Sequence, residues 1–237
     1  MKIGIIGYGK MGKIIEQVAL DRNHEIVAKV DHNSTIVEWQ ALEKADACIE
    51  FTQPKSAIQN FSWCVDRGLP IVTGTTGWYD KMDKVKSLVA EKNASFFWAS
   101  NFSIGVNLFW KLNKRLAEIM SNYEEYTPSI TEIHHAQKLD EPSGTAITAA
   151  EQIIERSKHL HNWKLSTEHP QKSDLSIEAL REGDVKGTHI VKYESPIDNI
   201  ELKHAAKSRE GFAKGAVFAA EFLAGKRGFF GMEDLLG

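Results

Sequence analysis

A glycine-rich turn between a strand and a helix dominates the start of this chain. Lys2–Ile6 has the short apolar run of a strand, and Lys10–Leu20 has helical spacing. The turn between them carries Gly7, Gly9 and Gly12 in the pattern G-x-G-x-x-G. Such glycines let the chain turn tightly, let a pyrophosphate approach the backbone and let the helix pack closely on the strand. This context predicts the first βα unit of a dinucleotide-binding fold.

An acidic residue stands where such a fold binds the ribose. Asp31 closes the second expected strand, Glu25–Val30, about twenty residues after the last glycine of the turn. A carboxylate at that position accepts a hydrogen bond from the ribose 2′-OH. A glycine-rich turn followed by an unrelated aspartate is the alternative, and the combined pattern favours the binding site.

Strand and helix patterns then alternate along the N-terminal region. Further strands are expected at Ala47–Phe51, Pro70–Thr73 and Ser95–Trp98, with helices between them at Pro54–Arg67 and Tyr79–Lys92. This alternation is typical of βαβ units and predicts a parallel sheet.

The pattern changes near Ile104. The elements expected from there on are a helix at Gly105–Met120, a strand at Ser129–His134, a helix at Gly144–Lys158, strands at Leu175–Arg181, Gly187–Tyr193 and Asn199–Ala205, and a final helix at Gly211–Ala224. The last three strands are expected to be antiparallel, since no helical pattern separates them. The predicted fold class is α/β. A Rossmann domain of residues 1–103 is completed by residues 209–237, and residues 104–208 form an α+β domain with an open mixed sheet.

Composition narrows the possible partners. The net charge of −3, with 42% hydrophobic and 26% charged residues, gives no electrostatic case for nucleic acid or an anionic membrane. The apolar stretch Ala213–Gly225 contains Lys214 and Glu221, so no membrane span is expected. Cys48 and Cys64 lack zinc or redox spacing and are interpreted as buried, inert thiols. The first residues have the pattern of a strand rather than a signal peptide, and a cytoplasmic protein is expected.

One segment concentrates groups suited to proton transfer and anion binding. His134 and His135 end a strand, and Lys138 follows in the loop. Histidine exchanges protons near neutral pH, and lysine is a compact cation that can hold a carboxylate. The turn at Ser143–Thr145 opens a helix, whose free N–H groups form an anion site. These groups predict a small, acidic substrate that gains a proton, although a histidine at a strand end is otherwise usually a surface or core residue.

The two adjacent histidines do not suit a shared metal ion. Neighbouring residues at the end of a strand point to opposite faces of the sheet. The chain also contains no His-Glu-x-x-His pattern. No metal site is therefore predicted.

The same segment resembles the signature of a known family. Residues 132–146 contain the pattern Glu-x-His-His-x-x-Lys-x-Asp-x-Pro-Ser-Gly-Thr-Ala, which is similar to that of the 4-hydroxy-tetrahydrodipicolinate (dihydrodipicolinate) reductases of the diaminopimelate–lysine pathway. Further matches run from the first strand to the last helix. The resemblance implies that His134 is the proton donor and acceptor and that Lys138 is a second catalytic cation. The substrate-binding residues that it implies are His135, Ser143, Gly144, Thr145 and Arg209.

Other residues of this region are interpreted without a catalytic role. Asp140 is interpreted as a loop or helix-start residue, and the turn Arg181-Glu182-Gly183-Asp184 as structural. Arg209 falls where the family places an arginine at the edge of the substrate pocket, but a solvated surface position fits a single charge equally well.

The resemblance also extends the cofactor site. Two loops at the carboxyl ends of expected strands match family segments that line the nicotinamide pocket, and ligands bind at that edge of open α/β sheets. Without the resemblance, they could equally be polar loop caps. The cofactor-binding residues that result are Gly7, Tyr8, Gly9, Lys10, Met11, Gly12, Asp31, Gly74, Thr75, Thr76, Ser100, Asn101, Phe102 and Ser103.

The expected cofactor is NADH, NADPH or both. Asp31 should repel a 2′-phosphate and so favour NADH, while Lys10 and His32 could offset that repulsion. Many relatives carry an arginine after the acidic residue, where this chain has His32.

The implied reaction reduces 4-hydroxy-tetrahydrodipicolinate with NAD(P)H to tetrahydrodipicolinate, with loss of water. The second domain would bind this small dicarboxylate and, as in relatives, join homotetramers through its sheet, whose exposed surface needs such cover. A non-enzymatic NAD(H)-sensing module would not need His134 and Lys138. Semialdehyde dehydrogenases need a cysteine after the Rossmann domain, where this chain has none.

Overall fold

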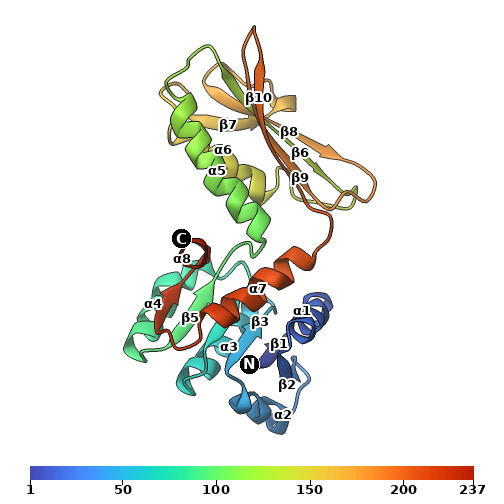
Figure 1. The fold of residues 1–237 in the computed structure, drawn as a ribbon, viewed down its shortest axis with the longest axis vertical. Helices are drawn as coiled ribbons and strands as arrows, with labels where there is room; N and C mark the ends of the chain where they lie inside the picture. The colour runs from blue at the N-terminus through green and yellow to red at the C-terminus, as the bar shows by residue number, and fades with distance from the viewer. The chain divides into compact units, whose positions relative to one another are not determined.

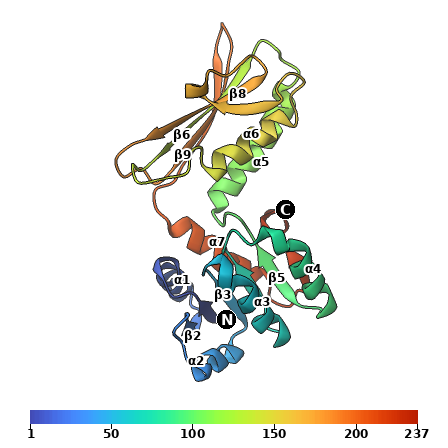
Figure 2. The same ribbon diagram turned by 180° about the vertical axis from the view of Figure 1, so that it is seen from behind.

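The computed structural model describes all 237 residues, which form two compact units (Figures 1 and 2). The first unit joins Met1–Ile104 to Glu210–Gly237, and the second unit is Gly105–Arg209. The second unit is therefore an insertion in the chain of the first. None of the helices is long and apolar enough to cross a membrane.

The first unit is built on a sheet of six parallel strands in the order β11-β5-β4-β3-β1-β2. The strands are β1 (Lys2–Ile6), β2 (Glu25–Val30), β3 (Ala47–Glu50), β4 (Ile71–Thr73), β5 (Ser95–Trp98) and β11 (Gly228–Phe230). Because β1 lies between β2 and β3, the strand order reverses there. Open α/β sheets bind ligands outside the carboxyl ends of the strands at such a reversal.

Helices cover both faces of this sheet. They are α1 (Lys10–Asp21), α2 (Ile36–Ala41), α3 (Pro54–Asp66), α4 (Met82–Glu91), α7 (Glu210–Phe222) and α8 (Met232–Leu236), with 3-10 turns at Leu42–Lys44 and Tyr79–Lys81. α1 and α7 share one hydrophobic core with Ile3 and Ile49, while α3 and α4 share another with Ile6 and Ile71. Burial on both faces explains why the central strands are continuously apolar rather than alternating.

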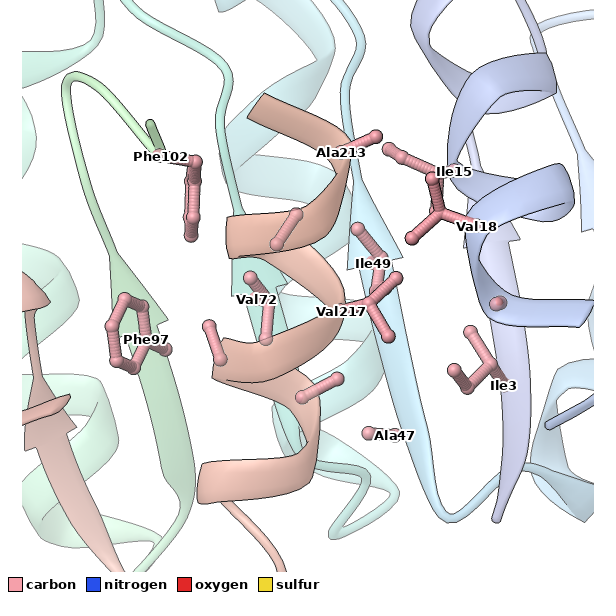
Figure 3. Packing of buried hydrophobic residues seen from close by; sticks show 14 of the residues in the cluster. Ile3, Ile15, Val18, Ala47, Ile49, Val72, Phe97, Phe102, Ala213 and Val217 are labelled. Atoms are coloured by element: carbon pink, nitrogen blue, oxygen red, sulfur yellow. The ribbon is translucent and has the colours of Figure 1, made fainter. Parts of the chain in front are cut away.

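The helix α7 brings the end of the chain back onto this sheet. Figure 3 shows its Ala213 and Val217 beside the strand residues Ile49 and Val72, with Ile15 of α1 close by. The buried face of α7 is made mostly of alanine and glycine. Small side chains let a helix lie close to the strands, so this face suits a tight sheet contact.

The second unit has a five-stranded sheet in the order β10-β9-β6-β8-β7. The strands are β6 (Thr127–His134), β7 (Asn162–Leu165), β8 (Asp174–Arg181), β9 (Thr188–Glu194) and β10 (Asn199–Ala205). β9 pairs antiparallel with β6 and β10, but β8 pairs parallel with β6 and β7. The expectation of antiparallel pairing is therefore wrong for β8. The helical crossover through α6 returns the chain to the same end of the sheet, so β7 runs parallel to β6. The connection of residues 166–173 then carries the chain back again, and β8 enters between β6 and β7 in the same direction.

Two helices cover one face of this sheet: α5 (Ile104–Met120) and α6 (Gly144–Ile154). Phe109 of α5 and three alanines of α6 share a core with Ile130 and Val191 of the sheet. A 3-10 turn at Ser166–Glu168 follows β7. The predicted fold class, a Rossmann-like parallel sheet with a mixed second sheet, is confirmed.

Candidate active site

Strand register gathers four polar side chains of the second unit. Glu132 of β6 is the direct cross-strand partner of His189 of β9, and His134 of β6 pairs with Arg181 of β8. Residues two apart on a strand share a face, so Glu132 and His134 lie on the same face as the buried core residue Ile130. The polar group therefore borders the hydrophobic core, on the side that α5 and α6 cover.

Glu132 is the buried anion of this group. Its side chain has no exposed surface, Arg181 donates to its Oε1 at 3.1 Å, and Nδ1 of His134 lies 3.2 Å from its Oε2. Burial acts to raise the pKa of Glu132, but the hydrogen-bond donors and positive charges around it, His134 first among them, outweigh burial and lower the pKa to about 2. Glu132 is therefore ionised at neutral pH.

His189 is a neutral member of the group. Its Nε2 lies 3.1 Å from Oγ of Ser143 and 3.8 Å from Oε2 of Glu132. Burial, and after it the neighbouring charge of His134, lower the pKa of His189 to about 3. The groups that can bring positive charge to Glu132 are therefore Arg181 and His134.

The loop after β6 holds Lys138 in an ion pair. Its Nζ lies 2.6 Å from both carboxylate oxygens of Asp140, and the hydrogen bond from Lys138 lowers the pKa of Asp140. The backbone carbonyl of Asp140 accepts from Arg181 at 2.7 Å. Asp140 thus links Lys138 to Arg181, which binds Glu132. A carboxylate ligand would compete with Asp140 for Lys138.

The first turn of α6 offers backbone N–H groups to a ligand. Ser143 caps the helix, and its Oγ accepts from the N–H of Ala146 at 3.3 Å. A Cβ built on Gly144 would meet no atom within 4 Å, so the space beside it is free of protein atoms. The carbonyl of Thr145 accepts from Nε1 of Trp110 at 3.1 Å, which fixes the turn. A fixed turn with free N–H groups suits a carboxylate.

His135 lies in a different environment from His134. It lines a cavity of about 230 Å³ together with Arg209, Lys186 and Asp184. The predicted substrate-binding residues therefore fall into two groups. His135 and Arg209 share this cavity, whereas Ser143, Gly144 and Thr145 form the start of α6, where Ser143 contacts the polar group around Glu132.

Three groups of this site lie close enough together to hold a metal ion. Ligand atoms of Glu132, His134 and His189 lie within 4.8 Å of one another. Nε2 of His189 already has Ser143 as a partner, and Arg181 anchors the carboxylate. These existing contacts of His189 and Glu132 fit a proton-transfer network. The absence of a metal site stays a prediction from the sequence.

In the first unit, the glycine-rich turn has the geometry that its residues predict. Gly7 has φ of +94°, and a Cβ there would overlap the carbonyl of Phe51. A Cβ on Gly12 would lie 2.5 Å from the carbonyl oxygen of Gly7, so this glycine permits close packing of α1 on the turn. A Cβ on Gly9, the N-cap of α1, would meet nothing within 4 Å. Internal packing thus explains two glycines, and the open space at Gly9 suits the approach of a pyrophosphate.

The remaining predicted residues of this turn surround the start of α1. The hydroxyl of Tyr8 donates to Glu16, and Nζ of Lys29 lies 4.7 Å from the centre of the Tyr8 ring. Lys10 and Met11 are the first residues of α1. Lys10 is exposed, whereas Met11 packs partly against the core.

Asp31 lies just beyond the end of β2 and is exposed. Its Oδ1 accepts from the backbone N–H of Asn33 at 2.9 Å, which fixes the carboxylate. Asp31 and His32 line a cavity of about 490 Å³ that also touches Trp39 and Trp63. In dinucleotide-binding folds a carboxylate at the end of this strand accepts from the ribose 2′-OH, and the exposure of Asp31 is compatible with that role.

The loops after β4 and β5 carry the other predicted cofactor residues. A Cβ on Gly74 would overlap the ring of Phe51, so only glycine fits there. Thr75 is buried, and Thr76 beside it is exposed. After β5, Ser100 is exposed, Phe102 is buried, and the backbone N–H of Ser103 donates to Oδ1 of Asn101 at 2.9 Å.

A buried carboxylate supports the loop after β4. Glu50, at the end of β3, has no exposed surface and accepts from Oγ1 of Thr73 at 2.6 Å, Oγ1 of Thr75 at 3.0 Å and Nδ2 of Asn60 at 3.2 Å. The hydroxyl of Thr52 also donates to it. Glu50 therefore fixes Thr75, although no local pattern in the sequence marks this role.

Comparisons with known proteins cover both units. Family models described as the N-terminus and the C-terminus of dihydrodipicolinate reductase match residues 1–102 and 105–236. The chain is 47% identical over 236 residues to a protein of Christiangramia forsetii named 4-hydroxy-tetrahydrodipicolinate reductase, with 100% of this chain and 98% of that protein covered. The chain belongs to the dihydrodipicolinate reductase family.

Further relatives agree with this assignment. A 4-hydroxy-tetrahydrodipicolinate reductase of Archaeoglobus fulgidus is 34% identical over 260 residues, with both chains covered completely. The solved structure of a dipicolinate-bound dihydrodipicolinate reductase from Paenisporosarcina sp. TG-14 has the same fold. Its TM-score is 0.79 at 23% identity, with 99% of this chain and 98% of that chain covered. The predicted family is confirmed, and with it an oxidoreductase of diaminopimelate–lysine biosynthesis.

Sequence reasoning assigned no role to Glu132 or His189 and interpreted Arg181 as structural. For Glu132 a signal exists, since it precedes His134 by two residues on the same strand and must share its face. For Arg181 and His189 no local signal exists, because only the pairing of β6 with β8 and β9 brings them to Glu132.

Proposed function

We propose that this protein reduces 4-hydroxy-tetrahydrodipicolinate to tetrahydrodipicolinate with NADH or NADPH. The nucleotide supplies a hydride, the site supplies a proton, and the ring hydroxyl leaves as water. The observation that carries the proposal is the geometry around His134. A histidine paired with a buried carboxylate lies in the same unit as Lys138 and the open start of α6. A proton donor with carboxylate-binding groups suits an acidic substrate.

The first unit is proposed to bind the dinucleotide. The open space at Gly9 and the free N–H groups of the first turn of α1 would hold the pyrophosphate. Asp31 would accept from the ribose, and the Glu50-supported loop at Thr75 would line the nicotinamide pocket, together with residues 100–103. When bound, the nucleotide supplies the hydride, and the chain's residues hold it in place.

The second unit is proposed to bind the dicarboxylate. Ser143, Gly144 and Thr145 would hold one carboxylate at the helix start, with Lys138 released from Asp140 as its counter-charge. His135 and Arg209 would act at the other cavity, whose cationic residues suit a second anionic group. His134 would donate the proton.

The cofactor preference and the assembly belong to the same proposal. We expect NADH to be used at least as well as NADPH, because Asp31 is exposed and fixed where a 2′-phosphate would lie. We expect a homotetramer formed through the face of the second sheet that α5 and α6 do not cover. A cytoplasmic location suits an enzyme of amino-acid biosynthesis.

A substrate-panel assay tests the proposed function. NADH oxidation should be fastest with 4-hydroxy-tetrahydrodipicolinate among a panel of imine and keto acids. Pyridine-2,6-dicarboxylate, a planar analogue of the substrate ring, should inhibit competitively against that substrate and more weakly as salt rises. Faster turnover of another acid would favour a different dehydrogenase. NADH binding without turnover of any panel member would favour a nucleotide-sensing module.

A further inference from the structure

We infer that Glu132, anchored by Arg181, is a positioning residue that binds the Nδ1–H of His134 and leaves Nε2 as the atom that delivers the proton. The inference deepens the proposed function, because it rests on the role of His134 as proton donor. It concerns a residue that touches neither the substrate nor the cofactor. Glu132 would act on the reaction only through His134.

The two carboxylate oxygens of Glu132 have separate tasks. Oε1 accepts from Arg181 at 3.1 Å, and Arg181 is in turn held by the backbone carbonyls of Asp140 and Leu180. Oε2 faces His134, whose Nδ1 lies 3.2 Å away, and is farther from His189, whose Nε2 lies 3.8 Å away. Anchoring one oxygen fixes the direction of the other. The imidazole therefore meets an immobile acceptor on its Nδ1 side.

The opposite side of the imidazole is kept clear by a glycine. A Cβ on Gly187 would lie 3.1 Å from Nε2 of His134, and the backbone of Gly187 has φ of +139°, which L side chains rarely adopt. Gly187 directly precedes β9, so the strand that positions His189 also leaves room at Nε2 of His134. Nδ1 of the ring thus lies beside Glu132, while a glycine leaves room at Nε2.

His189 does not compete with His134 for the negative charge of Glu132. The other imidazole, His189, lies with its ring centre 5.1 Å from that of His134, is neutral at physiological pH and bonds to Ser143. A buried carboxylate that faces one imidazole stabilises the protonated ring before the proton leaves. After Nε2 has given its proton to the substrate, Nδ1 keeps its own proton, which faces the carboxylate of Glu132. No rearrangement of the ring is then needed before it is protonated again.

The substitution Glu132→Gln tests this arrangement sharply. Arg181 can only donate, so the amide oxygen of the new side chain must turn toward it. The amide NH₂ group then faces Nδ1 of His134 and forces that nitrogen to accept. We expect neutral His134 to change from the Nδ1–H to the Nε2–H form, measured by ¹⁵N NMR of the imidazole. We expect kcat to fall at least about tenfold, with KM and NADH affinity within about twofold of wild type.

A matched control removes another carboxylate that lies beside an imidazole. Glu124 is exposed, and its Oε1 lies 3.1 Å from Nε2 of His159. Glu124→Gln should leave both kcat and the His134 imidazole signals unchanged. The inference is overturned if Glu132→Gln keeps a near-normal kcat, or if kcat falls while the Nδ1–H form persists, since that result indicates a merely structural role.

A second variant covers the case in which Glu132→Gln does not fold. Glu132→Asp keeps the charge but withdraws the oxygen from Nδ1 by about one methylene, so kcat should fall with NADH affinity unchanged. A wild-type kcat in Glu132→Asp would count against the inference. If the wild-type protein showed no reductase activity at all, the proposed function would fail. The NMR form of His134 would still report on Glu132.

Discussion

At the scale of single residues, the two adjacent histidines should differ in function. His134 contacts buried Glu132, whereas His135 lines the cavity with Arg209. We expect His134→Ala to lower kcat by about 10²–10⁴-fold with a modest change in KM, because general acid catalysis is lost. His135→Ala should mainly raise KM. Steady-state kinetics with NADH saturating measure both, and a near-normal kcat in His134→Ala with a large loss in His135→Ala would exchange their roles.

Asp31 should set the choice between the two nucleotides. Its carboxylate is exposed and fixed by the N–H of Asn33. Asp31→Ala removes an acceptor for the ribose and a charge that repels a 2′-phosphate. We expect kcat/KM to fall for NADH and to change less, or rise, for NADPH. Asp21→Ala, at the exposed end of α1, is the matched control and should change neither value. A strong wild-type preference for NADPH would contradict the assignment.

Single residues also show how far the sequence can predict the site. The signature segment indicates His134, Lys138 and the helix start, because these residues lie within one short stretch. The partners of His134 come from three strands, and a strand pair cannot be read from local patterns. The ion pair of Lys138 with Asp140 depends on the path of the loop, which no periodicity describes.

At the scale of elements, α7 should be intolerant of side chains on its buried face. A Cβ on Gly215 would overlap the backbone carbonyl of Phe102, which cannot move as a flexible side chain could. Overpacking of this kind costs about 1–3 kcal/mol. Phe102 also lies in the proposed nicotinamide loop. We therefore expect Gly215→Ala to lower the thermal midpoint and to weaken NADH binding, measured by calorimetry and by fluorescence titration.

The same helix provides the control for this prediction. A Cβ on Gly211 would lie 3.6 Å from Oγ of Ser103, an ordinary contact distance. Alanine is favoured over glycine in helices by about 1 kcal/mol, so Gly211→Ala should leave the thermal midpoint unchanged or raise it. Equal losses in both variants would mean that α7 disfavours any added side chain, and that the contact of Gly215 with Phe102 does not determine the effect.

Length alone does not decide which parts of the fold the sequence reveals, since the three-residue strand β4 was predicted and the three-residue strand β11 was not. The long strands and helices were predicted within a few residues of their observed bounds, because their apolar periodicity extends over several turns or alternations. The short elements α2, β7, β11 and α8 were not predicted. Strand β11 has three residues, and its pairing with β5 requires the chain to return after the second unit. That contact is a property of the tertiary fold.

At the scale of the whole molecule, the strand order follows from connections between distant segments. Residues of β1, β3, β4 and α7 share one core although α7 follows them by more than a hundred residues. Apolar patterns predicted the existence of both sheets, but not that β6 would lie between β8 and β9. This central position of β6 gives Glu132 partners on both sides.

The buried histidine of the second unit should make its stability depend on pH. The pKa of His189 is lowered to about 3 in the folded protein, below the ordinary value of 6.5. Between these values the unfolded chain binds a proton that the folded chain does not, so stability falls as pH falls below 6.5. Glu132, with its pKa lowered to about 2 from 4.5, adds a loss only below about pH 4.5. Between pH 6.5 and 4.5, the change in unfolding free energy therefore reports on the histidines and not on Glu132.

We expect His189→Asn to flatten this dependence by about 1.4 kcal/mol per pH unit, the value of one proton. Unfolding free energies from hydrogen exchange of amides in β6 and β9 measure the stability of the strands around His189. Burial also lowers the pKa of His204. His204 should therefore contribute in the same direction, so that part of the pH dependence of stability remains in His189→Asn. His159→Asn, at an exposed position, is the control and should retain the wild-type slope. An unchanged slope in His189→Asn would mean that His189 is protonated in the folded protein. The assignment of a neutral His189 as the partner of Ser143 would then be wrong.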